Sequence, residues 1–319
     1  MKRNQEVERI ADKAQQHQRY FFGKTANQQR AMRKRWLANE YVRPCSNIYA
    51  RNEYYKMLNP QERAMHLIRT LAAKYPHKVF GAMSAALVLG LECSWTNTGI
   101  EHVQIATEGS MSKDTRGTIE KIYVHPLTFV TQNGIRVTPA ERTLVDCGLR
   151  YSYRQSLGIF DSALRLGLVT RKDVDKACAG LHKDCAPVQK LLRDADGKSE
   201  NGGESLCRAT ILEAGFTQPE LQHEFRDPAD PRHLFRTDFL WICNRKVIAL
   251  EYDGMEKYTN QRMTNGHSAR HVVYEERQRE DALRRAGVTT ILRTDYEEVM
   301  QPRPLIQKLI NNGVPMRRI

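Results

Sequence analysis

The stretch TDFLWICNRKVIALEYDG, residues 237–254, decides the fold of the C-terminal part of the chain. Two apolar runs flank a polar Asn-Arg pair at 244–245, a pattern typical of two antiparallel strands joined by a tight turn. A two-residue turn places Asp238 directly opposite Glu251 in this hairpin, whereas a three-residue turn pairs Asp238 with Leu250.

Three carboxylates gather at the open end of this predicted hairpin. Glu251 and Asp253 are two residues apart on one strand, so their side chains project to the same face. In the two-residue register the Cβ atom of Asp238 lies about 5 Å from that of Glu251. Like charges at that spacing destabilise a sheet unless a cation lies between them, and oxygen ligands favour Mg²⁺ or Mn²⁺. We therefore expect a metal site at Asp238, Glu251 and Asp253, against the alternative of ordinary strand-end acids.

Further polar residues fall near this cluster. Gly254 lets the backbone turn directly after the strand, which brings Lys257 within reach to orient an attacking water. Glu204, near the start of the preceding helix, offers a further carboxylate. Gln222 lies on the strand before Asp238 and is suited to bind a phosphate or water, although a plain surface side chain is the preferred interpretation.

The neighbouring sequence predicts the other elements of an α/β domain. An amphipathic helix begins near 204, strands follow near 219–225, 237–243 and 246–254, and a charged helix at 272–287 precedes a strand at 288–293. The final strand–helix–strand step allows a right-handed parallel crossover.

The chain has 319 residues, which is enough for two or three domains. The polar, Gly-containing stretch at 198–203 is the best candidate boundary. Upstream, residues 59–198 predict a middle α/β domain with helices at 60–74 and 80–91 and strands in HVQIAT and KIYVHP. A helix in TPAERTLVDCGLR is expected to begin with Thr138 as N-cap and Glu141 completing a capping box.

Residues 1–58 have a different character. The first 80 residues hold 17 Lys and Arg against 6 Asp and Glu, so most of the net charge of +13 lies there. This excess fits a polyanionic partner such as nucleic acid, and it fits a merely solvated basic face equally well on charge alone. The helical spacing in RAMRKRWLA, followed by the strand-like NIYA, predicts a winged helix whose DNA-binding side chains are Arg30, Arg33, Lys34 and Arg35; an ordinary helical hairpin is the alternative.

Several classes of protein do not fit the sequence. The chain lacks a long apolar run and an apolar signal core near its start, so we expect a cytoplasmic protein without a membrane partner. Seven cysteines without CxxC spacing disfavour a disulfide framework or a zinc ribbon. Neither GxxxxGK[ST] nor GxGxxG occurs, so no glycine-rich loop for a nucleotide cofactor is expected.

The C-terminal third resembles the very-short-patch-repair-like endonuclease family of the PD-(D/E)XK superfamily. The resemblance lies in GESLCR, PELQ, RTDFLW, ALEYDGMEKY and the pattern EERQRED, RRAG and VTTILR. It implies a restriction-endonuclease-like α/β/α core over 199–319 and catalytic roles for Glu204, Asp238, Glu251 and Asp253, with Lys257 accessory. It also implies that Glu276 and Arg279 support the site or contact DNA. One departure is that Asp253 stands where the superfamily has the lysine of Glu-x-Lys.

The N-terminal two-thirds is similar to the abortive-infection antitoxin family in LNPQER, MSAALVLGLE and GIRVTPAERTLVDCGLR. This resemblance implies a winged helix that binds DNA, followed by a small α/β domain. It also implies a defence, toxin–antitoxin or mobile-element setting, with a cognate toxin or defence-system protein as a further partner.

Three functions remain open on the sequence. The first is a Mg²⁺- or Mn²⁺-dependent DNA endonuclease, in which the basic N-terminal region docks the duplex. The second is a non-catalytic DNA-binding regulator or antitoxin with a degenerate nuclease fold, favoured by the lysine departure at 253. The third is a nuclease that acts on RNA, against which the winged-helix pattern argues.

Overall fold

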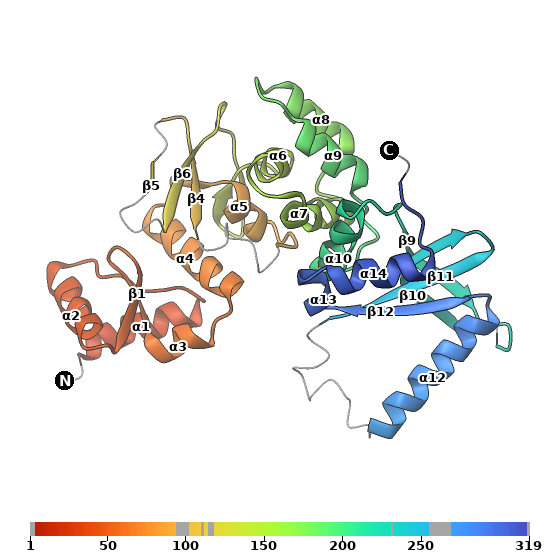
Figure 1. Ribbon diagram of the computed structural model, residues 1–319. Coiled ribbons are helices and arrows are strands. Elements are labelled where there is room, and N and C mark those ends of the chain that lie inside the picture. Colours follow the sequence, from red (N-terminus) through yellow and green to blue (C-terminus); the bar gives the residue numbers. More distant parts are fainter. Residues whose placement is uncertain are drawn as a thin grey trace. The chain divides into compact units, whose positions relative to one another are not determined.

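The computed structural model describes residues 4–93, 102–109, 112–113, 118–230, 232–254 and 269–317. The chain folds into two compact units. The first contains Met1–Ile159 and Leu168–Lys190, and the second contains Phe160–Gly167 and Leu191–Ile319. The second unit thus takes in a short segment that lies well before the predicted boundary at 198–203. Both units contain helices and sheets, which confirms a mixed α/β organisation (Figure 1).

The first unit begins with two helices and a hairpin. Asn4 caps the first helix, and a capping box between Thr25 and Gln28 starts the second. An isolated bridge between Phe21 and Tyr49 ties the connecting segment to the hairpin. The elements are α1 (Gln5–Gln16), α2 (Ala26–Leu37), β1 (Tyr41–Cys45), β2 (Ile48–Arg51) and α3 (Asn52–Met57). Their core consists of Val7, Ala11, Phe21, Met32, Tyr41 and Tyr49.

A six-stranded sheet of order β5-β6-β4-β3-β8-β7 forms the rest of the first unit. Its strands are β3 (Val79–Phe80), β4 (Val103–Thr107), β5 (Ser112–Lys113), β6 (Ile119–Tyr123), β7 (Val130–Gln132) and β8 (Ile135–Val137). The helices of this region are α4 (Pro60–Lys74), α5 (Ala82–Val88), α6 (Ala140–Arg150), α7 (Tyr153–Arg165), α8 (Arg171–Ala179) and α9 (Ala186–Asp194). Helix α7 and helix α9 each contribute residues to both units.

The predicted capping box of α6 is wrong. Pro139 occupies the N-cap position, and no side chain caps the helix. Thr138 is held elsewhere, because its backbone N–H donates to the Phe80 carbonyl at 2.9 Å and its hydroxyl bonds that of Thr143 at 2.8 Å. The strand pairing therefore fixes Thr138 in the sheet and removes it from the helix terminus.

The second unit has the predicted order of helix, three strands, helix and strand. Its four-stranded sheet has the order β12-β11-β10-β9, in which β9, β10 and β11 are antiparallel and β12 runs parallel to β11. The parallel crossover expected from the sequence is therefore confirmed. The elements are α10 (Gly202–Glu213), β9 (Glu220–Arg226), β10 (Leu234–Cys243), β11 (Lys246–Asp253), α12 (Ala269–Arg285), β12 (Thr290–Asp295), α13 (Tyr296–Met300) and α14 (Arg303–Asn312).

The hairpin β10–β11 has the predicted two-residue turn. Asn244 and Arg245 both adopt a positive φ, 47° and 64°, as a turn matched to the twist of antiparallel strands requires. The ladder runs from Cys243 opposite Lys246 to Phe239 opposite Leu250. One further step in this register places Asp238 opposite Glu251, as expected.

Two apolar cores enclose this sheet. Helices α10, α13 and α14 cover one face and α12 covers the other (Figure 1). Phe239, Trp241 and Leu250 face the first group, whereas Leu240 and Ala249 face α12. Period-two alternation therefore puts Glu251 on the α12 side, near the end of its strand. In the described residues, every helix is too short or too polar to traverse a lipid bilayer.

Candidate active site in the second unit

One amide joins two of the predicted carboxylates. The Gln222 side chain donates from Nε2 to Glu204 Oε2 at 3.1 Å and to Asp238 Oδ1 at 3.3 Å. The other oxygen of Asp238 accepts the Tyr252 backbone N–H at 2.8 Å. Glu204, Gln222 and Asp238 come from α10, β9 and β10, so three separate elements meet at this point.

Glu204 is held at the first turn of α10. Asn201 caps the helix by accepting the backbone N–H groups of Gly203 and Glu204. The Glu204 carboxylate accepts Asn201 Nδ2 at 2.7 Å and the Glu200 backbone N–H at 2.8 Å. An acid near a helix N-terminus is also favoured by the helix dipole. These contacts fix the carboxylate while leaving it only 5% exposed.

Gln222 owes its position to an unusual backbone conformation. Its φ is 53°, a value rare for a side chain other than Gly, Asn or Asp. Leu221 packs on the α10 side of the sheet, whereas Phe225 packs on the α12 side. In a regular strand, residues four apart would lie on the same side. The left-handed residue therefore coincides with a change of face along β9 and directs the amide toward the acids. Such strain is common where a functional group must be aimed.

The acids influence one another electrostatically. Burial raises the pKa of the Glu204 carboxyl to about 7, and the nearby negative charge of Asp238 adds to this effect. Hydrogen bonds from the Glu200 backbone and Gln222 oppose part of the rise. A carboxyl with a pKa in this range can exchange a proton near neutral pH.

Glu251 has a different partner from the other two acids. Its Oε1 accepts a hydrogen bond from Arg279 Nη2 of α12 at 2.9 Å, and the same nitrogen donates to the Arg236 carbonyl at 2.8 Å. Asp253 ends β11 beside Asp295 of β12. The resemblance implies that Arg279 supports the site or contacts DNA; in the structure its side chain contacts Glu251.

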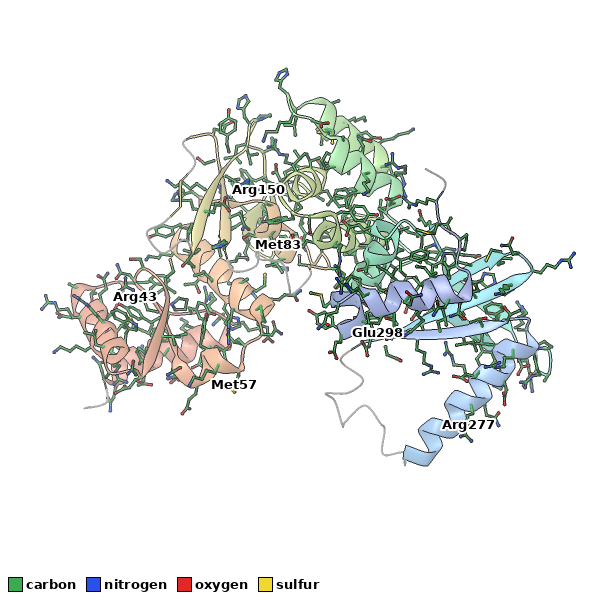
Figure 2. The ribbon with its side chains drawn as sticks, in the orientation of Figure 1. Arg43, Met57, Met83, Arg150, Arg277 and Glu298 are labelled. Atoms are coloured by element: carbon green, nitrogen blue, oxygen red, sulfur yellow. The ribbon has the colours of Figure 1, made fainter. Side chains whose placement is uncertain are left out.

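Two other residues predicted from the sequence have no described side chain. Lys257 lies outside the described residues, and Glu276 lies within α12 at a position where only the backbone is described. Arg277, also on α12, is exposed (Figure 2).

The residues meet only part of the requirement for a divalent ion. Carboxylate oxygens are the ligands that Mg²⁺ and Mn²⁺ prefer, and the repulsion between Glu204 and Asp238 would be relieved by a cation. However, within the described part of the chain, no three His, Cys, Asp or Glu side chains are grouped so that they could hold a metal ion. An ion bound by both Asp238 and Glu251 would share the Glu251 carboxylate with Arg279, which already bonds its Oε1.

A buried ion pair holds α10 in place. Arg208 donates from Nη2 to both oxygens of Asp161 at 2.6 Å, and both side chains are 0% exposed. Arg208 also donates from Nη1 to the Asp194 carbonyl. The Asp161 carboxylate further accepts the Asp196 backbone N–H at 2.9 Å. The pair thus fastens the end of α7 to the helix that carries Glu204.

The pKa of Glu204 leads to a prediction about stability. A carboxyl whose pKa is higher in the folded state than its ordinary 4.5 stabilises the fold fully below pH 4.5 and loses this contribution as pH rises to about 7. Between pH 5 and pH 8 we expect the second unit to lose about 3 kcal/mol from this group, a loss that Glu204→Gln removes. Urea unfolding with EDTA at both pH values measures it.

The matched control is Glu213→Gln, which changes an exposed acid on the same helix. This variant should keep the pH dependence of the unaltered chain. An unchanged pH dependence in Glu204→Gln would show that the folded-state pKa of Glu204 is not raised.

The predicted DNA-binding side chains divide into two groups. Arg30, Arg33 and Lys34 are exposed on α2. Arg35 is buried, because its Nη1 pairs with Glu8 at 2.6 Å and Glu40 at 3.2 Å. A helical repeat places every third or fourth residue on one face, so Arg35 falls on the core side of α2 and holds α1 against it.

Comparisons with known proteins find two relatives that match part of the chain. No protein-family model matches the chain. Two curated proteins of Mycobacterium tuberculosis, from strains CDC 1551 and H37Rv and both named as uncharacterized, are each 28% identical to it over 126 residues. The match covers 39% of this chain and 45% of each relative. No solved structure matches.

Proposed function

We propose that the chain is a DNA-binding protein whose second unit hydrolyses phosphodiester bonds, in the manner of the PD-(D/E)XK superfamily that its sequence resembles. The observation that carries this proposal is the Glu204–Gln222–Asp238 cluster. A strained residue aims one amide at two acids from different elements, beside the position of Glu251. Ordinary strand-end acids need no such arrangement.

The chain's own residues have separable tasks in this proposal. Gln222 orients the facing oxygens of Glu204 and Asp238, and the Tyr252 N–H fixes the other Asp238 oxygen. With a pKa near 7, Glu204 can accept a proton from water or return it at neutral pH. Arg279 supplies positive charge next to Glu251. A divalent ion, if held, supplies charge stabilisation at a phosphoryl oxygen and lowers the pKa of a bound water.

A second candidate is favoured by the Glu251–Arg279 pair. An arginine that satisfies the third carboxylate at 2.9 Å makes a stable arrangement without any ion. Together with Asp253 in place of the motif lysine, this supports a non-catalytic DNA-binding regulator or antitoxin on a nuclease-like fold.

Incubation of the purified chain with supercoiled plasmid distinguishes the two candidates. The hydrolase should nick or linearise the plasmid with Mg²⁺ or Mn²⁺ and leave it intact with EDTA. A chain that retards a duplex fragment in EDTA but never cuts plasmid or single-stranded RNA with either metal would support the regulator instead.

The DNA-binding part of the proposal rests on the N-terminal region. A winged helix would account for its order of helix, helix and hairpin, with the segment between the helices bridged to the hairpin at Phe21. Helix α2 presents three exposed cations immediately before the hairpin β1–β2. We place the contacts with DNA phosphates at Arg30, Arg33 and Lys34, and leave Arg35 to its structural pairs.

Removal of these three cations should weaken DNA binding in a salt-dependent way. Each lost phosphate contact lowers the slope of log K against log salt by about 0.9, so the Arg30→Gln/Arg33→Gln/Lys34→Gln variant should lose up to about 2.7. Fluorescence anisotropy of a labelled duplex over a series of salt concentrations measures the slope.

A triple variant on α8 and the following loop, Lys172→Gln/Lys176→Gln/Lys183→Gln, removes the same charge from exposed positions elsewhere. Its slope should stay near that of the unaltered chain. Equal losses in both variants would mean that net charge, and not the α2 surface, governs binding.

A further inference from the structure

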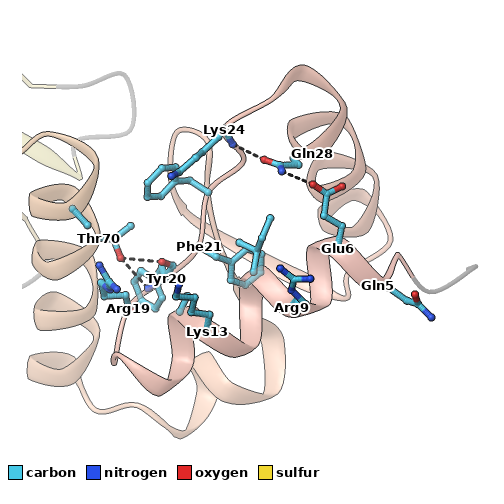
Figure 3. A pocket seen from close by; sticks show the side chains of 14 residues that line it. Gln5, Glu6, Arg9, Lys13, Arg19, Tyr20, Phe21, Lys24, Gln28 and Thr70 are labelled. Atoms are coloured by element: carbon cyan, nitrogen blue, oxygen red, sulfur yellow. Dashed lines mark hydrogen bonds between the residues drawn. The ribbon is translucent and has the colours of Figure 1, made fainter.

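A pocket of about 830 Å³ is lined entirely by residues of the first unit. It is formed by α1, the segment that connects α1 to α2, the start of α2 and one face of α4 (Figure 3). Its volume falls within the range of small-molecule sites in proteins.

Four cations line this pocket. Arg9 and Lys13 come from successive turns of α1, and Arg19 and Lys24 come from the connecting segment; Figure 3 shows them around Phe21. In the described part of the first unit, none of the four forms an ion pair with a carboxylate. Glu6 is the single acid of the lining, so three positive charges remain uncompensated.

The other acids of α1 are occupied elsewhere. Glu8 pairs with Arg35 at 2.6 Å and with Arg51 at 2.7 Å, and Asp12 pairs with Arg51 at 2.7 Å. Since Glu8 and Asp12 lie one position before Arg9 and Lys13, the helix separates its charges onto two faces. The acidic face of α1 pairs with Arg35 and Arg51, and the basic face lines the pocket.

The rest of the lining combines an apolar part with the neutral polar side chains of Gln5, Tyr20, Gln28 and Thr70. Ile10, Ala14 and Ala73 contribute aliphatic surface, and Phe21 and Phe22 contribute aromatic rings. Lys74 lies over the Phe22 ring, with Nζ 5.3 Å from its centre. A ligand that matches the pocket therefore combines several negative charges with a flat, weakly polar part.

We propose that this pocket binds a phosphate chain that carries a nucleobase, either a free nucleoside triphosphate or the 5′-phosphorylated end of a nucleic acid strand. The cations bind the phosphates, and the apolar lining takes the base. The site uses side-chain charge, in keeping with the lack of a glycine-rich phosphate loop in the sequence.

The proposed site adjoins the start of α2. Gln28 lines the pocket, and its Oε1 accepts the backbone N–H groups of Lys24 and Thr25 while its Nε2 donates to Glu6 at 2.7 Å. The bond to Thr25 is part of the capping box that begins the helix carrying Arg30, Arg33 and Lys34. An occupant would therefore contact the structure that begins the proposed DNA-binding helix.

Calorimetric titration of ATP into the full chain, with EDTA and without DNA, tests the proposal independently of any hydrolytic activity. We expect saturable binding at one site. Arg9→Gln/Lys13→Gln should weaken it about tenfold or more, because two charged hydrogen-bond donors are lost. Both residues are exposed on α1, so the variant should fold, which its thermal unfolding curve checks.

The matched control is Lys56→Gln/Lys172→Gln, which removes two exposed charges outside the pocket and should bind ATP as the unaltered chain does. Competition separates the sources. Displacement of ATP by a 5′-phosphorylated oligothymidylate, and not by its unphosphorylated form, identifies a strand end, whereas displacement by free nucleotides alone identifies a free nucleotide. Absence of saturable ATP binding, or equal weakening in the control, would overturn the proposal.

Discussion

Replacement of Asp238 by asparagine is expected to lower plasmid cleavage by about a thousandfold while leaving duplex binding in place. Asparagine keeps the shape and one acceptor for the Tyr252 N–H, but it removes the negative charge that faces Glu204 across Gln222. Removal of a single preorganised electrostatic group from an active site costs about 10²–10³ in rate. The initial rate of conversion of supercoiled to nicked plasmid with Mg²⁺ measures the effect.

Glu224→Gln is the matched control for this variant. Glu224 lies on β9, two residues beyond Gln222, and its side chain is exposed. Neutralising it should leave the cleavage rate within a factor of two or so, as for other surface changes. Full cleavage by Asp238→Asn would remove the cluster from the mechanism, even if the chain proves to be a nuclease.

The largest effect on stability is expected at the buried pair of α7 and α10. Asp161→Asn leaves the guanidinium of Arg208 buried without its counter-charge, at a site that is 0% exposed. Breaking one partner of a buried pair destabilises proteins by about 3–5 kcal/mol. Few other contacts would stabilise the Arg208 guanidinium, since its Nε has no hydrogen-bond partner in the described residues. Urea unfolding at pH 7 measures the loss.

A double variant separates charge from packing at this pair. Asp161→Leu/Arg208→Met replaces both ions by apolar side chains, and such replacements are often neutral or stabilising. The double variant should therefore recover most of the stability that Asp161→Asn loses. If the double variant is as unstable as the single one, lost hydrogen bonds and not an unpaired charge account for the effect.

The hairpin register was predictable because it depends on local chemistry alone. The Asn-Arg pair at 244–245 sits between two apolar runs, and only a two-residue turn keeps the apolar side chains of both strands on matching faces. The same locality explains the prediction of the crossover from β11 to β12. The wrong cap of α6 shows where local sequence is insufficient. The sequence does not reveal that the Thr138 N–H donates to the carbonyl of Phe80 in β3.

The role of Gln222 could not be foreseen with the same ease. Its positive φ depends on the sheet and not on its own preference. In the structure, Leu221 pairs with Phe239 and His223 pairs with Thr237. This register sets Gln222 opposite Asp238. Because β9 ends at Arg226 and β10 begins only at Leu234, no tight turn fixes this register, and the sequence alone left the surface interpretation preferred.

Partners that come from distant elements were the least predictable. Arg35 is separated by 27 residues from Glu8, and Arg279 by 28 from Glu251. The assignment of Arg35 to DNA contact depended only on charge, and charge alone does not say whether a cation faces solvent or an acid. The role of Arg279 came from the resemblance, which did not specify Glu251 as its partner. Helical periodicity with Met32 as the core reference places Arg35 on the inner face, which is a usable rule for similar helices.

The ion pair of Asp161 and Arg208 also limits how this chain can be rearranged in evolution or in the laboratory. A fragment that begins at 199 inherits the arginine but leaves the aspartate behind, because Phe160–Gly167 belongs to the second unit. Gene fusions that transplant the second unit are expected to keep its stability when they break upstream of α7 or exchange Arg208 for an apolar residue. The second unit therefore depends for its stability on Asp161 of α7, a helix that lies outside the sequence motifs of this unit.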